Sequence, residues 1–83
     1  MLDNNNINVP LALATARKKY EVIEILAGQK LNSLLLGVGI IPGVEIELIQ
    51  NSSYLKDGII VKVGRSRFAM GKGMALKIMV KEV

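Results

Sequence analysis

The side chains able to do chemistry in this chain are few in kind. It has no histidine and no cysteine, so its reactive groups are carboxylates, amines, guanidinium groups and two tyrosines. Acid–base and nucleophilic catalysis near neutral pH most often use His or Cys. No pair of the remaining groups has a spacing typical of a catalytic site. The sequence therefore predicts a protein that is not an enzyme.

Glu45 and Glu47 form a carboxylate pair with a suggestive spacing. Two residues apart on a strand, they project from the same side and in principle offer oxygen ligands to a divalent cation. The same alternation is typical of the solvated face of a strand, and we favour that interpretation. Without imidazole or thiolate ligands, tight binding of Fe²⁺ or Zn²⁺ is not expected. We predict no catalytic, metal-binding or cofactor-binding residues.

Basic side chains gather around a predicted hairpin turn, with Arg65 and Arg67 flanking its tip and Lys62 nearby. A basic tip can contact phosphates or an acidic patch on a partner. Positive charge there also serves solubility and the protection of a sheet edge. The net charge of +4 is compatible with nucleic acid, an anionic membrane face or an acidic protein, and it selects none of them.

These residues must be positioned by short elements, the first of which is a leucine-rich helix predicted over residues 29–38. Its expected core stripe, at helical spacing, is Leu31, Leu35 and Val38. Leu34 and Leu36 leave two alternatives open. They either pack under the barrel, or they form an exposed apolar patch beside Lys30 that suits a protein partner or closes a homodimer.

Five short segments are predicted as strands from their β-branched and aromatic residues and the turn signals between them. They are residues 20–26, 44–50, 59–63, 66–70 and 78–83. The second alternates most clearly, and its expected inward residues are Val44, Ile46 and Leu48. Both faces of the first carry apolar residues, and Ile23 with Ile25 is the preferred inward face. Such short strands are typical of a small barrel or sandwich.

Glycine and proline mark the turns between these elements. Gly39, Pro42 and Gly43 are expected to be structural, because glycine permits backbone angles that a Cβ forbids and proline presets φ. Gly64-Arg65 is a Gly-X pair suited to a tight hairpin. One further helical turn has room within residues 71–77.

The chain is expected to form one domain over residues 9–83, preceded by a flexible tail over residues 1–8 that contains four asparagines. Residues 9–14 fit either one helical turn or an extended lead-in. The longest nearly apolar run, residues 34–41, is too short to span a membrane. Basic residues follow the apolar run 9–16 rather than precede it, opposite to a signal peptide. We expect the protein to be cytoplasmic.

The order of several motifs supports a family resemblance. They are the leucine-rich helix, Gly39-x-x-Pro42-Gly43, the alternating strand, Ile59-Ile60-Val61-Lys62-Val63-Gly64, Phe68-Ala69-Met70 and Met74-Ala75-Leu76-Lys77-Ile78. Over residues 10–83 this order resembles the FeoA domain, the small cytosolic component of bacterial ferrous iron uptake. The chain departs from the family pattern before the first strand, where Ala16-Arg17 lies near the place of the usual Pro-Gly.

The resemblance implies a mainly β fold, a small SH3-like barrel of about five short strands with one or two short inserted helices, and no catalytic activity. It implies an interaction module that docks on the cytosolic region of the FeoB permease and modulates transport, with no cofactor beyond weak association of transition-metal ions. A related fold occurs as the C-terminal domain of iron-dependent repressors. The candidate partner-binding residues are Lys30, Leu34, Leu36, Arg65 and Arg67.

The alternative functions are a nucleic-acid-binding SH3-like module and a detached repressor-type SH3-like domain. The chain has only three aromatic residues, which leaves few for base stacking once the core is filled, so nucleic acid is disfavoured as a partner. The oligomeric state stays open.

Overall fold

The computed structural model describes residues 7–52 and 58–83, which form an antiparallel sheet with three short helical segments. The described strands are β1 Asn8–Pro10, β2 Lys18–Ile25, β3 Glu45–Asn51, β4 Ile59–Val63, β5 Ser66–Met70 and β6 Ile78–Glu82. The helices are the 3₁₀ turn η2 Leu11–Leu13, α1 Gln29–Gly37 and α2 Lys72–Ala75. The order across the sheet is β1-β6-β2-β3-β4-β5.

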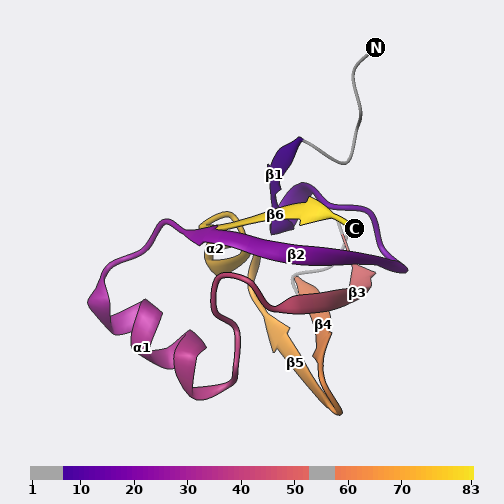
Figure 1. The fold of residues 1–83 in the computed structure, drawn as a ribbon. Coiled ribbons are helices and arrows are strands. Elements are labelled where there is room, and N and C mark those ends of the chain that lie inside the picture. The colour runs from indigo at the N-terminus through magenta and orange to yellow at the C-terminus, as the bar shows by residue number, and fades with distance from the viewer. Residues whose placement is uncertain (1–6, 53–57) are drawn as a thin grey trace.

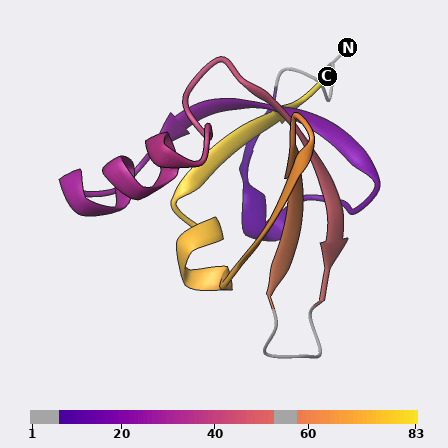
Figure 2. The same cartoon turned by 90° about the horizontal axis from the view of Figure 1, so that it is seen from below.

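The sheet curls into an SH3-like barrel around the long strand β2, which pairs with β6 on one side and β3 on the other (Figure 1). Seen from below, α2 lies at one end of the curled sheet and α1 stands off to one side (Figure 2). The predicted fold class is confirmed, with β1 added to the five expected strands.

The core is aliphatic and comes from alternate residues of the strands. In β3 the alternation is as expected, since Ile46 and Leu48 are buried while Glu45 is exposed. The other fully buried strand residues are Val22, Ile59, Val61, Ile78 and Val80. Each such side chain contributes roughly 1.5–3 kcal/mol of burial energy, which matters in a chain this small.

The inward face predicted for β2 is half wrong. Tyr20 and Val22 are the buried residues, and Ile23 lies outside the core. The pairing of β2 with β6 shifts between Val22 and Glu24, and this β-bulge reverses the alternation beyond it. Ile25 therefore does pack against the core, as expected.

The segment after β1 closes one end of the barrel. Residues 9–14 combine both expected alternatives, an extended strand followed by a 3₁₀ turn, and Leu11 is fully buried. The side-chain amide of Asn51 holds this turn, because its Nδ2 donates to the carbonyls of Ala12 (3.0 Å) and Ala14 (2.9 Å). The turn is thus tied to β3 across the core.

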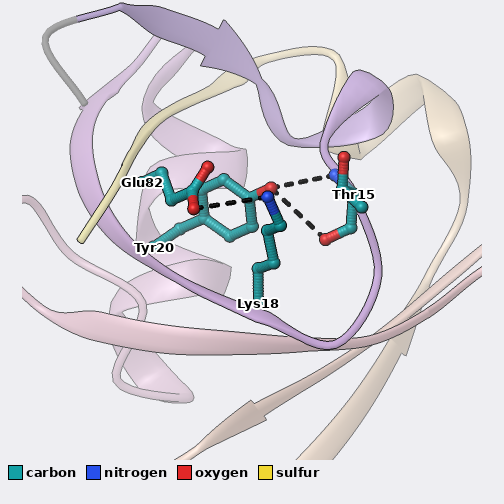
Figure 3. Close-up of polar contacts among 4 residues, drawn as sticks. All are labelled: Thr15, Lys18, Tyr20 and Glu82. Atoms are coloured by element: carbon teal, nitrogen blue, oxygen red, sulfur yellow. Dashed lines mark hydrogen bonds and ion pairs between the residues drawn. The ribbon is translucent and has the colours of Figure 1, made fainter. Parts of the chain in front are cut away.

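The buried ring of Tyr20 supports the same end of the barrel (Figure 3). The N–H of Thr15 donates to the hydroxyl oxygen of Tyr20 at 2.9 Å, and that hydroxyl donates to the Thr15 carbonyl at 3.3 Å. Beside the ring, Lys18 and Glu82 form an ion pair of 3.4 Å between β2 and β6. Both charged groups are partly exposed, so this pair contributes little to stability.

Two predicted segments fall largely outside the described residues. Of the predicted tail 1–8, the structure describes Ile7 and Asn8, and Asn8 pairs with Lys81 in the sheet. Most of the loop between β3 and β4, residues 53–57, also lies outside the described part.

Candidate interaction surface

Helix α1 is held to the barrel by a narrow stripe of side chains. Leu35 is 2% exposed, and Leu31 and Val38 are partly buried against the core. These three residues are the stripe expected from helical spacing. The rest of α1 stands away from the sheet (Figure 2).

The C-terminal end of α1 is firmly capped. Gly39 has φ +86°, the left-handed conformation common just after a helix, and its N–H donates to the Leu36 carbonyl at 3.0 Å. The N–H of Ile40 donates back to the Leu35 carbonyl at 2.9 Å, and the Ile40 side chain is fully buried. The helix therefore ends at a fixed point on the barrel.

Pro42 and Gly43 complete the turn that leads into β3. Gly43 has φ +95°, and its N–H donates to the Val22 carbonyl at 2.7 Å. In return the Val22 N–H donates to the Val44 carbonyl at 2.9 Å. The turn is thereby pinned to the middle of β2, which fixes where the helix leaves the barrel.

Leu34 and Leu36, whose exposure the sequence left open, both lie on the surface. Leu34 is 56% exposed and Leu36 is 62% exposed. Because an α-helix turns about 100° per residue, they occupy opposite flanks of α1, one on each side of the buried Leu35. We call these two residues the α1 flanks.

The flank that carries Leu34 also carries a shallow apolar hollow of about 630 Å³, lined by Lys30, Leu31, Ser33 and Leu34. The structure thus brings the predicted Lys30 and Leu34 together. It does not bring Leu36 to the same flank. The helix consequently presents leucine in two directions rather than one flat patch.

Two exposed apolar residues near α1 were not singled out from the sequence. Leu26 follows the end of β2, and Ile41 precedes the turn into β3. Leu26 lies just past the inward-facing Ile25, and Ile41 comes directly after the buried Ile40. Their position at the ends of apolar runs was the signal that could have found them.

Arg65 and Arg67 belong to the hairpin of β4 and β5, whose turn lies below β2 in Figure 1, as α1 does. Arg65 occupies the turn, and Arg67 is exposed opposite Lys62. The predicted basic tip is therefore present. It forms a surface separate from α1, although a Cβ placed on Gly39 would lie only 3.7 Å from Val63 in β4.

The outer face of the sheet carries a row of charged residues across four strands. In the strand register Lys19 lies opposite Glu47, Glu47 opposite Lys62, and Lys62 opposite Arg67. A hollow of about 300 Å³ lies over part of this row, lined by Lys19, Glu45, Ile46, Glu47, Lys62 and Gly64. Because a lysine stands on either side of Glu47, this face favours the interpretation of solvated strand residues over a cation site.

The donor atoms of this chain do not fit a transition-metal centre. Imidazole and thiolate are absent from the sequence, and the described residues contain no group of three or more acidic side chains that could hold a metal ion. Tight binding of a soft or borderline metal ion needs such ligands. The expected absence of a cofactor stays a prediction.

In the described part of the chain, no helix has both the length and the apolar character needed to cross a membrane. The longest described helix is α1, with nine residues.

Comparison with known proteins identifies the family. The model of the FeoA domain family matches residues 9–82. The chain belongs to the FeoA family. This confirms the resemblance in the sequence, and the match spans every strand of the described barrel except the first residue of β1. A comparison with curated proteins finds no match.

Solved structures share the fold of this FeoA-family chain. An iron uptake regulatory protein, FeoA, is 34% identical with a TM-score of 0.84, and the match covers 93% of this chain and 100% of that one. Iron(II) transport protein A from Clostridium thermocellum is 28% identical with a TM-score of 0.81, over 90% of this chain and 46% of that one. A manganese-dependent transcriptional repressor shares the fold alone, with 16% identity and a TM-score of 0.82 over 92% and 42% of the two chains.

Proposed function

We propose that this chain is a non-catalytic, cytoplasmic interaction module of bacterial ferrous iron uptake that docks on the cytosolic region of a FeoB-type permease and modulates transport. Its membership of the FeoA family supports the pathway. The observation that carries the docking mode is the exposure of leucine on both flanks of α1. The proposal assigns the chain no resident metal, and iron is the cargo of the permease.

The α1 flanks favour insertion of the helix into a groove of the partner. A flat partner surface would cover Leu34 or Leu36 but not both, because they point in opposite directions. A groove covers both, and amphipathic helices are commonly bound in this way. Burying one such leucine contributes roughly 1.5–3 kcal/mol, so the pair supplies a useful share of a transient affinity.

Charge supports the same orientation. Lys30 stands beside Leu34 in the hollow on α1, and Arg65 and Arg67 form a second, separate basic surface on the hairpin of β4 and β5. Exposed cations around an apolar contact raise the rate of encounter with an acidic partner more than they raise the final affinity. We therefore expect the leucines to set the dissociation rate and the basic residues to set the association rate and its dependence on salt.

The test is binding of the full chain to the cytosolic fragment of the permease, measured by biolayer interferometry. Leu36→Glu should weaken binding at least about tenfold, because a buried leucine contact is worth more than 1.4 kcal/mol. Leu13→Glu is the matched control, since Leu13 is 73% exposed and lies in η2, outside α1. It should leave binding unchanged.

Thermal unfolding of both variants checks that the barrel stays folded. Absence of binding by the wild-type chain would rule out the permease fragment as the partner. Equal binding by wild type, Leu34→Glu and Leu36→Glu would show that α1 does not make the contact.

A further inference from the structure

Strand β5 has an open edge. It is the last strand in the sheet order, and among the described strands only β4 pairs with it. The opposite end of the sheet is β1, whose three residues include Pro10. An open edge of five residues, as in β5, presents backbone groups that can pair with another strand.

The hairpin geometry decides which backbone groups face outward. Gly64 has φ +60° and Arg65 keeps a negative φ, the pattern of a two-residue turn with glycine first. Val63 and Ser66 close this turn as a hydrogen-bonded pair, and hydrogen-bonded pairs then recur at every second residue. Arg67 and Ala69 fall between them, so their N–H and C=O groups point to the open edge.

All charged side chains of the longer segment that contains this edge are basic. From residue 58 to residue 81 the sequence holds no Asp or Glu and six basic residues, namely Lys62, Arg65, Arg67, Lys72, Lys77 and Lys81. The acidic side chains of the described residues lie instead on β2, β3 and β6. A second copy of this edge would set arginine close to arginine, which disfavours self-pairing.

We infer that β5 accepts an extended acidic segment of a partner protein as an added strand. The outward groups of Arg67 and Ala69 supply backbone hydrogen bonds, and both side chains are exposed beside them. A carboxylate opposite Arg67 forms a cross-strand charge pair on the outer face. The next residue faces the partly buried Phe68, so it is apolar. The recognised segment therefore alternates acidic and apolar residues.

The probe is an acetylated peptide of alternating Glu and Val, about eight residues long, titrated into the ¹⁵N-labelled full chain. Amide shifts should be concentrated in residues 65–70. A peptide of alternating Lys and Val should cause none. N-methylation of alternate peptide amides should weaken binding about three- to tenfold in one set and leave it unchanged in the other, because only alternate amides face β5.

The matched pair of variants is Ala69→Pro and Ala69→Val. Proline removes the outward N–H without touching the pairs between β4 and β5, a position where edge strands tolerate it. Valine keeps the N–H. Ala69→Pro should weaken peptide binding about three- to tenfold, and Ala69→Val should not. If Ala69→Pro fails to fold, the N-methylated peptides decide the question on the wild-type chain.

Equal binding of both N-methylated sets, or shifts outside the hairpin, would overturn the inference. So would binding of a single-stranded oligonucleotide at these residues with no binding of the acidic peptide, since that would assign the basic edge to nucleic acid. The inference does not depend on the proposed partner, because Leu36 lies on α1 and not at the edge of β5. Leu36→Glu should therefore leave peptide binding unchanged.

Discussion

At the scale of single residues, Arg17 occupies a backbone position that suits glycine. Its φ is +68°, and among non-glycine residues in the described part of the chain no other has a positive φ. A hydrogen bond from its N–H to the Leu48 carbonyl, 2.6 Å long, holds this conformation at the start of β2. The FeoA pattern has Pro-Gly near this place, and a glycine would adopt this φ without the strain that a Cβ creates.

Arg17→Gly should therefore stabilise the barrel by about 1 kcal/mol, because glycine relieves the left-handed strain that a Cβ creates. The matched control is Lys19→Gly, in the extended part of β2, which should lower stability by about 0.5–1 kcal/mol. Urea unfolding of both variants measures the difference. A loss of stability in Arg17→Gly similar to that in Lys19→Gly would contradict the account.

The burial of some residues could be predicted from the sequence, and that of others could not. Ile46 and Leu48 were predicted correctly, because β3 alternates cleanly and one face alone is apolar. Ile23 was assigned to the core wrongly, because the β-bulge arises from the pairing of β2 with β6 and leaves no local signal. The exposure of Leu34 and Leu36 also depends on where the barrel lies against α1, which helical spacing alone does not give.

At the scale of elements, the position of α1 depends on the turn that follows it. Gly39→Ala should destabilise the chain by about 1–2 kcal/mol, because Gly39 has a left-handed φ. Its Cβ would meet Val63 at an ordinary contact distance of 3.7 Å, so the cost is conformational rather than steric. The end of α1 should fray, and binding through the α1 flanks should weaken with it.

Gly37→Ala is the matched control two residues earlier. Gly37 is the last residue of α1, has a negative φ, and a Cβ there meets nothing within 4 Å. Alanine should stabilise the helix by about 0.5–1 kcal/mol. Hydrogen exchange of the α1 amides measures both effects. Equal protection in the two variants would show that the turn does not fix the helix.

The elements were largely predictable because their limits are set by local chemistry. The observed bounds of β4 and β5 match the predicted ones, because Gly64-Arg65 dictates a tight turn that ends the β-branched run of β4 and begins β5. The helix ends within one residue of its prediction, at glycine. The open edge of β5 was not predicted, because an edge is defined by strand order across the sheet.

At the scale of the whole molecule, the barrel separates two kinds of surface. Helix α1 offers apolar side chains on a projecting element, and the hairpin of β4 and β5 offers basic side chains along an open edge. Neither surface gathers the residue types that catalysis or a transition-metal centre needs. We propose that both surfaces act by contact with partners and that α1 makes the main contact with the permease.

Methyl NMR of the leucine-labelled full chain, titrated with the cytosolic fragment of the permease, shows whether α1 makes this contact. The methyl groups of Leu34 and Leu36 should shift and broaden on saturation, while those of Leu13, which is exposed in η2, should not. Shifts at Leu13 with none on α1 would rule out α1 as the contact, as would a spectrum that the fragment leaves unchanged.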